Sequence, residues 1–397
     1  MTDRGSRKAL VAVVAVVLCL GVVELIFYVA TLFLPGNFNY SEPTRADFDA
    51  YLAHADETRN LRPGWLPSAE AISEAGYRLS PAGAGYQAAC VSLYGDSFTW
   101  GYRVSDAEAW GNVLTEHLGC RVDNFGVSGY GPDQALLRFA DNAVDQAPVV
   151  VLAVWAENIA RIINQDRAMI YSDGIRLKPR FILNGSGDLE LVPRPPITAG
   201  DLEAYVNDPA TFLAHEYFIP ERTSLSKRRL GFPYLIRLPY YFTYKRLYLS
   251  LLALAFDVPS WYDELYQPEH PSNALQLMTA ILVAFDRQAR DSGRIPLIFL
   301  LPSARDAEYQ RSGGPWVYRP LLSALEEHDV QAINIGAEMV RRMGDEDYCD
   351  YMCLVKARRS GHYTVKGNRL LADIARDILV AKGLVAAASP RGQATAD

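Results

Sequence analysis

The sequence predicts an α/β protein, with a parallel sheet covered by helices on both faces in a three-layer α/β/α arrangement. Short apolar runs typical of buried strands alternate with helical patterns over residues 87–165, and the alternation resumes over residues 273–385. Glycine and polar residues follow several of the strand-like runs at their carboxyl ends, where ligands bind in open α/β sheets. The fold class therefore also predicts where a site would lie.

The composition is that of a globular protein with a sizeable core. Hydrophobic residues make up 50% of the 397 residues, and this length allows one large domain or two ordinary ones. The net charge of -7 argues against a nucleic-acid partner, because a general nucleic-acid binder presents a basic face.

An almost wholly apolar segment over residues 9–34 is interrupted by Glu24 and Thr31. At ~1.5 Å per residue it exceeds the ~30 Å hydrocarbon thickness, so we expect a single transmembrane anchor. Basic residues precede it, namely Arg4, Arg7 and Lys8. The positive-inside rule then places residues 1–8 in the cytoplasm and the rest of the chain in a periplasmic or extracellular compartment. A cleaved signal peptide is the alternative, but the run is long and lacks a clean cleavage site.

Glu24 would lie inside the membrane, towards its outer side. A carboxylate at that depth is costly and often marks a helix–helix contact. The alternative is that it snorkels to the headgroups or is protonated.

Residues 35–86 are polar, contain Pro and Gly, and are expected to form a stalk and lead-in to the core. The first part of the core, residues 87–165, contains three predicted strands and a helix after the second strand. The strands are Cys90–Tyr94, Arg121–Phe125 and Val149–Trp155, and the helix is Asp133–Gln146.

The second part of the core, residues 273–385, opens with a helix over Asn273–Arg290. Its apolar residues recur at helical spacing: Leu275, Met278, Leu282 and Phe285. The predicted elements that follow are strand Ile295–Leu301, helix Pro320–Glu327, strand Gln331–Ile335 and helix Leu370–Leu379. The small, polar tail over residues 386–397 is expected to be disordered.

The alternation fails over residues 166–272, which we interpret as an insertion. Arg180–Leu183 and Leu189–Val192 flank a Gly-rich turn, as in a β-hairpin. Residues 234–256 are aromatic and basic, with Tyr240, Tyr241, Tyr244 and Tyr248 beside Arg237, Lys245 and Arg246. That segment has three interpretations: a helical lid, a membrane-surface segment, or core packing with solvated basic groups.

The motif Gly95-Asp96-Ser97-Phe98 directly follows the first predicted strand. A strand-to-helix turn there would hold the Ser97 hydroxyl at the carboxyl edge of the sheet. The first N–H groups of the helix would lie beside it, ready to stabilise negative charge. This is a suitable place for a nucleophile, although glycine, aspartate and serine are also common in plain turns.

Further motifs follow the later strands. Gly126-Val127-Ser128-Gly129-Tyr130-Gly131 follows the second strand, Ala156-Glu157-Asn158 follows the third, and Ser360-Gly361-His362 precedes the last helix. This order of Ser, Gly, Asn and His resembles the SGNH (GDSL-type) hydrolase and acyltransferase superfamily, over roughly residues 88–160 and 294–382. The resemblance implies a flavodoxin-like core and acyl-ester chemistry.

The resemblance assigns Ser97 as the nucleophile and His362 as its general base, since an imidazole titrates near neutral pH. It also implies an oxyanion hole formed by the Ser97 N–H, the Gly129 N–H and the Asn158 amide. Gly126 is an alternative to Gly129. Without Ser97 and His362 in the same sequence, these glycines would indicate only a tight loop, and Asn158 would indicate only a helix N-cap.

The sequence departs from the family pattern at two positions. Arg359 stands where members usually carry the Asp that orients the histidine, and Ile159 follows the Asn in place of another Asp. His362 is then oriented either by a backbone carbonyl or by an acid from elsewhere, with Asp350 and Asp347 as candidates. Asp96 is expected to brace the turn. Loss of the acid can cost about 10⁴-fold in rate, so a non-catalytic protein stays possible.

The five cysteines allow two disulfides in an oxidising compartment. Cys90 and Cys120 open the first two strands, and would lie at the same end of the sheet if those strands are parallel neighbours, as in the resembled fold. The alternative is a pair of small buried hydrophobes. Cys349 and Cys353 are four residues apart, and Cys19 lies in the anchor. Neither a metal nor a cofactor is expected, because the sequence lacks a His-Glu-x-x-His or paired-Cys pattern.

Together these features predict a membrane-anchored, extracytoplasmic serine esterase or O-acyltransferase. The resemblance and the expected location imply that its substrates are acyl esters, above all acetyl esters. The ester would be carried by a cell-surface polysaccharide or would be another small molecule. The alternative is a catalytically inactive SGNH-like protein that binds carbohydrate or assists polysaccharide assembly.

Overall fold

The computed structural model describes residues 3–32, 44–53, 73, 76–171, 175–219, 232–236, 245–258, 260–355 and 361–386. By its internal contacts the chain separates into two compact units. The smaller unit comprises Met1–Leu52, Asp166–Leu177 and Pro195–Leu252. The larger unit comprises Ala53–Gln165, Lys178–Arg194 and Ala253–Asp397.

A five-stranded sheet of order β2-β1-β3-β6-β7 forms the centre of the larger unit, and all its neighbouring strands are parallel. The strands are β1 (Ala89–Gly95), β2 (Arg121–Asn124), β3 (Val149–Trp155), β6 (Ile295–Leu301) and β7 (Ala332–Asn334). In sequence order this is 2-1-3-4-5, the flavodoxin-like arrangement. The predicted α/β class is confirmed.

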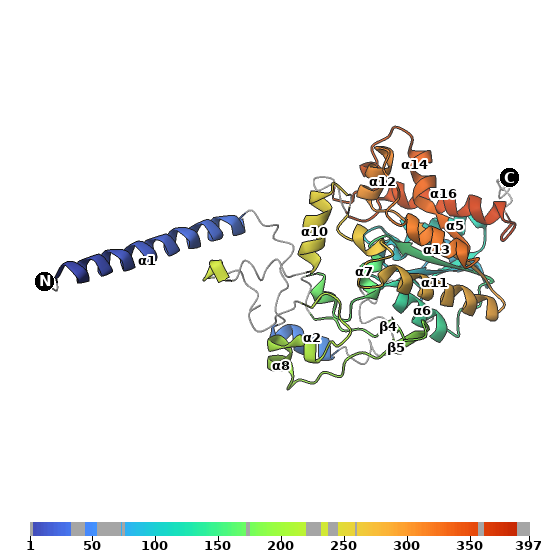
Figure 1. The fold of residues 1–397 in the computed structure, drawn as a ribbon. Helices are drawn as coiled ribbons and strands as arrows, with labels where there is room; N and C mark the ends of the chain where they lie inside the picture. Colours follow the sequence, from blue (N-terminus) through green and yellow to red (C-terminus); the bar gives the residue numbers. More distant parts are fainter. Residues whose placement is uncertain are drawn as a thin grey trace, which may run out of the picture. The chain divides into compact units, whose positions relative to one another are not determined.

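Alternate residues of each strand face different helices, because successive side chains point to opposite sides of a sheet. Val91 and Leu93 of β1 belong to the buried cluster that includes α5, α14 and α16. Tyr94, which follows Leu93, instead packs its ring on Phe139 of α6, which in turn packs on Phe285 of α11. The sheet thus lies between two helical layers, and Figure 1 shows α14 and α16 on one side and α6 and α11 on the other.

The larger unit contains helices at all four predicted positions, together with helices that were not predicted, such as the one over Ile335–Met343. They are α4 (Ser97–Trp100), α5 (Trp110–Leu118), α6 (Pro132–Asp141), α7 (Asn158–Ile162), α11 (Ala274–Asp291), α12 (Ala304–Arg311), α13 (Arg319–Glu327), α14 (Ile335–Met343), α15 (Cys349–Met352) and α16 (Val365–Ala381). Helix α6 ends five residues before its predicted end at Gln146. Helix α16 begins before its predicted start, because the Thr364 side chain caps it by accepting a hydrogen bond from the Gly367 N–H.

The predicted hairpin is present as β4 (Arg180–Leu183) and β5 (Leu189–Val192), which pair antiparallel. It belongs to the larger unit. Two buried cations hold its base there: Lys178 pairs with Asp133 of α6, and Arg180 donates to the carbonyl of Ile163. Residues 76–86 of the expected lead-in also join this unit, where buried Arg78 donates to the carbonyls of Gly101 and Val104.

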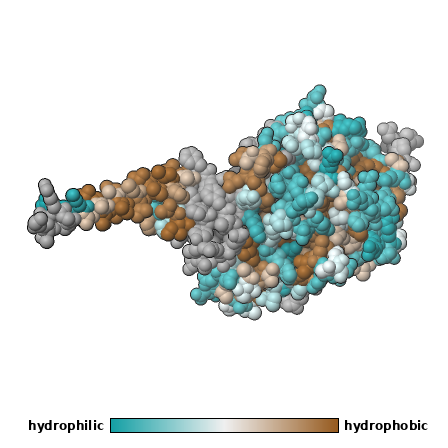
Figure 2. All heavy atoms as spheres, viewed as in Figure 1, coloured by the Kyte–Doolittle hydropathy of each residue, from teal (hydrophilic) through white to brown (hydrophobic). Residues whose placement is uncertain are grey.

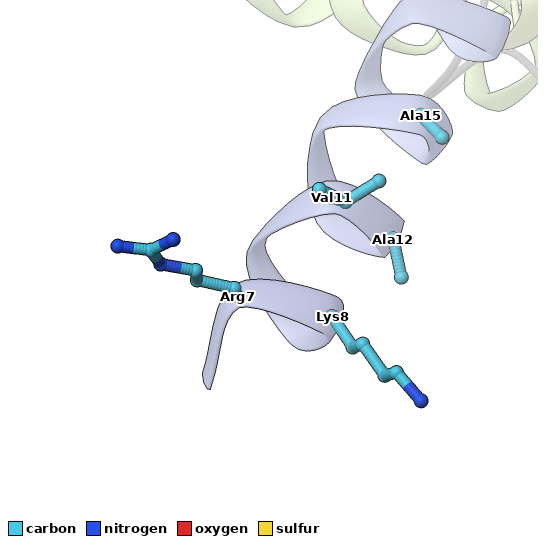
Figure 3. A pocket seen from close by; sticks show the side chains of 5 residues that line it. All are labelled: Arg7, Lys8, Val11, Ala12 and Ala15. Carbon is cyan, nitrogen blue, oxygen red and sulfur yellow. The ribbon is translucent and has the colours of Figure 1, made fainter. Parts of the chain in front are cut away.

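The first helix of the smaller unit, α1 (Asp3–Leu32), contains a segment long and apolar enough to cross a membrane. The most apolar 18-residue window of this segment, Arg7–Ala30, has a mean hydropathy of 3.0, and none of that window is buried. Hydrophobic side chains cover it in Figure 2. Figure 3 shows Arg7 and Lys8 projecting from its first turns, beyond Val11, Ala12 and Ala15.

The carboxylate of Glu24 on α1 accepts hydrogen bonds from the backbone N–H groups of Tyr234 and Leu235, at 2.6 and 3.1 Å. The rings of Tyr28 and Tyr234 lie 5.3 Å apart beside this contact. Glu24 therefore makes a contact within the smaller unit. Its partner is the short segment that contains Tyr234 and Leu235, not a second long helix.

The aromatic and basic segment is described only in part. Residues 237–244, which include Arg237, Tyr240, Tyr241 and Tyr244, lie outside the described residues. Helix α10 (Lys245–Ala255) buries Leu249 but leaves Tyr248 54% and Leu254 80% exposed. The other described helices of the insertion and lead-in are α2 (Arg45–Ala53) and α8 (Leu202–Asn207). The lid, membrane-surface and packing interpretations all stay predictions.

Two disulfides are present, Cys90–Cys120 and Cys349–Cys353. β1 and β2 are parallel neighbours, so Cys90 and Cys120 lie at the same end of the sheet, with Cα atoms 6.0 Å apart. That separation is within the usual range for a disulfide. Cys19 on α1 carries a free thiol.

Candidate active site

The Ser97 turn is formed by the end of β1 and the start of α4. Gly95 has φ 146°, and a Cβ there would lie 2.4 Å from the carbonyl oxygen of Ala153, so only glycine fits without rearrangement. Asp96 caps α4, its Oδ1 accepting from the Phe98 N–H at 2.8 Å. This is the bracing role expected for Asp96, and it leaves Ser97 as the first residue of the helix.

The structure brings Ser97 and His362 together across 265 residues of sequence: Ser97 Oγ and His362 Nε2 are 2.7 Å apart. The imidazole lies against two rings. It stacks on Phe98 at 4.7 Å between centroids, and Tyr102 lies 4.8 Å away on a tilted plane. Phe98 and Tyr102 belong to the same turn as Ser97, so one short segment supplies the hydroxyl and restrains the ring.

The loop that carries His362 is held by its backbone. The His362 carbonyl accepts from the Leu354 N–H, and the Thr364 N–H donates to the Tyr351 carbonyl, at 3.1 and 2.9 Å. The Cys349–Cys353 disulfide closes the segment that makes these contacts. The contacts of Tyr351 and Leu354 therefore help to position the imidazole of His362 relative to α4.

Each of the two candidate orienting acids, Asp347 and Asp350, makes a contact that does not involve the imidazole of His362. Asp347 Oδ1 accepts from the Cys349 N–H at 3.0 Å, and the Asp350 carbonyl accepts from Thr364 Oγ1. Arg359 and Ser360 lie outside the described residues. A dyad and an acid-assisted pair both stay predictions.

The loop after β2 contains both glycine candidates. The Gly126 N–H donates to Asn124 Oδ1 at 3.0 Å within the loop. Gly129 adopts φ 92°, a conformation that favours glycine. The assignment of Gly129 as an oxyanion donor, with Gly126 as the alternative, stays a prediction.

The Asn158 side chain is buried and fixed from both ends. Its Oδ1 accepts from the Trp155 N–H at 3.1 Å, and its Nδ2 donates to Asp96 Oδ2 at 2.9 Å. Because the oxygen faces an N–H and the nitrogen faces a carboxylate, the amide orientation is determined. One bond of Nδ2 joins Asn158 to the residue before Ser97, which brings the third and first motifs together.

Arg161 is a residue that the sequence did not single out. Its guanidinium is 5% exposed and binds three acceptors: Glu157 Oε2 at 2.8 Å, the Tyr130 carbonyl at 2.8 Å and Asp96 Oδ2 at 3.3 Å. The spacing of Glu157 and Arg161, four residues apart, is typical of a helical ion pair. The contacts with Asp96 and Tyr130 have no such signal, since they join Arg161 to two other loops.

Behind the site, Tyr363 donates to the Pro302 carbonyl and packs edge-on against Phe98. Burial, with the nearby charges of Asp96 and Asp306, raises the pKa of Tyr363 well above its usual value. Its hydroxyl thus stays protonated and structural. Within the described residues, no three His, Cys, Asp or Glu side chains gather as metal ligands would.

No protein-family model matches the sequence, and no relative is found among curated proteins. Among solved structures, the chain is similar to a protein assigned to the lipolytic G-D-S-L family from Desulfitobacterium hafniense, at 13% identity and a TM-score of 0.33, covering 73% of this chain and 98% of the other. It is also similar to a member of that family from Veillonella parvula (10% identity, TM-score 0.32, covering 73% and 97%). An alpha/beta hydrolase enzyme from the Lake Arreo metagenome matches at 12% identity and a TM-score of 0.34, covering 75% and 98%.

Proposed function

We propose that this chain is a serine esterase or O-acyltransferase of the SGNH type that acts through an acyl-Ser97 intermediate. The observation that carries the proposal is the 2.7 Å separation between Ser97 Oγ and His362 Nε2 at the carboxyl end of a parallel strand. A hydroxyl at that distance from an imidazole can pass its proton to the ring as it attacks a carbonyl.

In the proposed reaction, His362 takes the Ser97 proton as Oγ bonds to the ester carbon. The negative charge that develops on the former carbonyl oxygen is met by the N–H groups of Ser97 and Gly129 and by the Asn158 amide. The protonated imidazole then gives its proton to the leaving alcohol, and the acyl group stays on Ser97. Water or an acceptor hydroxyl, deprotonated by His362, releases the acyl group and completes hydrolysis or transfer.

We infer further that the enzyme is anchored in a cell membrane by α1 and acts outside the cytoplasm. The apolar, unburied helix and its basic start support the anchor, and two disulfides suit an oxidising compartment. An acetyl ester of a surface or exported polysaccharide is the proposed substrate class, because such esters are available there. The alternative is a carbohydrate-binding or polysaccharide-assembly protein that has kept the fold and lost turnover.

A fluorophosphonate probe tests the proposal, since it reacts covalently with an activated serine. We expect the wild-type chain to be labelled at Ser97, and Ser97→Ala and His362→Ala to lose both labelling and hydrolysis of a short-chain acyl ester. Ser92→Ala is the matched control: Ser92 is fully buried in β1, the strand that leads to Ser97, and its removal should leave labelling intact. An unlabelled wild-type protein would favour the binding protein.

A further inference from the structure

The buried Arg161 guanidinium contacts every segment that would supply an oxyanion donor. Its Nη1 donates to Asp96, the residue before Ser97, and to the carbonyl of Tyr130, the residue after Gly129. It extends from α7, the helix that begins at Asn158. We propose that Arg161 is the positioning residue of the oxyanion hole, an inference that rests on the proposed esterase function.

Asp96 Oδ2 is the point at which the three segments meet. This single oxygen accepts from Asn158 Nδ2 at 2.9 Å and from Arg161 Nη1 at 3.3 Å, while Oδ1 of the same carboxylate caps α4. A rotation of the Asp96 side chain would therefore break the cap on the Phe98 N–H of α4 and release the Asn158 amide together. The arginine holds the carboxylate against that rotation by a charge-assisted hydrogen bond.

The arginine is itself held from both sides. Glu157 Oε2 accepts from its Nε at 2.8 Å, and the guanidinium carbon lies 5.5 Å from the ring centre of Trp155. Asp96 and Glu157 are each 1% exposed, so one cation neutralises part of the charge of two buried carboxylates. Such a pair without its cation would be strongly disfavoured.

The fork shape of the side chain explains why arginine is required. A guanidinium presents several N–H groups in one plane, whereas a lysine ammonium is a compact point charge on a flexible stem. Lysine at this position would keep the positive charge but could not reach the same three acceptors at once. Arg161→Lys therefore keeps the positive charge and removes the positioning role.

Steady-state kinetics of Arg161→Lys on a neutral acyl ester test this inference. We expect kcat to fall about 10–100-fold with KM nearly unchanged, because oxyanion donors act on the transition state. In an Asn158→Ala background the same substitution should cost less, since one of the donors that Arg161 positions is already absent. Arg180→Lys is the matched control: Arg180 is also buried and binds backbone carbonyls, but outside the site, and its kcat should be unchanged.

If Arg161→Lys does not fold, Glu157→Ala releases one side of the guanidinium and should lower kcat several-fold at constant KM. The inference is overturned if the variant that folds keeps wild-type kcat, if its effect is equal in both backgrounds, or if Arg180→Lys lowers kcat as much. A wild-type chain that hydrolyses no acyl ester and takes no phosphonate label would instead contradict the proposed function, and the positioning role with it.

Discussion

Asp96 lies between Ser97 and Asn158 in space, and its side chain binds on both sides: Oδ1 to the start of α4 and Oδ2 to the Asn158 amide. The residue before the proposed nucleophile thus joins the first and third motifs of the site directly. This arrangement gives each motif a separate, measurable role.

Asn158→Ala should lower kcat for a short-chain acyl ester about 10²–10³-fold, as expected for one lost oxyanion donor. The control is Asn142→Ala, which removes another buried amide that donates to the Tyr94 hydroxyl, away from the site. It should lower thermal stability without lowering kcat. Equal kcat in the wild type and Asn158→Ala would contradict the oxyanion role.

Arg359→Asp restores the acid that the SGNH pattern carries three residues before the histidine. If His362 relies on a backbone carbonyl, we expect kcat on a neutral acyl ester to be unchanged or higher, because the acid holds the correct tautomer. Arg358→Asp makes the same change of charge one residue away and should bring no gain. A loss confined to anionic esters would indicate that Arg359 binds substrate, and a loss on neutral esters would contradict the expectation.

The two disulfides should rank in opposite order for their effects on stability and on activity. Removing Cys90–Cys120, which spans 30 residues, should destabilise the fold by about 3–4 kcal/mol, against about 2 for the four-residue span of Cys349–Cys353, if chain entropy dominates. Yet only the second closes the segment that binds the His362 loop. We expect the Cys349→Ser, Cys353→Ser variant to lose more activity per folded molecule. Denaturation and kcat measured on both double variants check this, after non-reducing peptide mapping of the wild type.

In the smaller unit, burial raises the pKa of Asp166 to about 6, from an ordinary value of 3.8. The folded form then holds a proton that the unfolded chain has lost, so the stability present below pH 3.8 declines as the pH rises through about 6. Asp166→Asn mimics the protonated group. The difference in the free energy of unfolding between Asp166→Asn and the wild type should shift in favour of the variant as the pH rises from 4 to 7.5, by up to about 3 kcal/mol. A difference that does not vary with pH would contradict this.

Reporter fusions placed after Pro35 should be active only with a reporter that works outside the cytoplasm. The basic residues before the apolar helix predict this orientation. The intact protein should also resist carbonate extraction from membranes. A mature N-terminus beyond Leu34 would instead identify α1 as a cleaved signal.

The sheet could be predicted because its strands are continuous apolar runs, as in β3, and the Ser97 turn because its motif follows such a run. Arg161 could not, because its partners Asp96 and Tyr130 become neighbours only when β1, β2 and β3 pair. Helix α12 was missed for a different reason. Its sequence is polar, and it is stabilised by a capping box between Ser303 and Asp306, not by an apolar face.

The large sequence separation between Ser97 and His362 has a consequence for synthesis. A chain made from its N-terminus contains the serine long before the histidine, and the two meet only once the last helix has packed onto the sheet. During growth of the chain the hydroxyl therefore has no base beside it. If the chain is the proposed esterase, Ser97 becomes reactive only when the fold is complete.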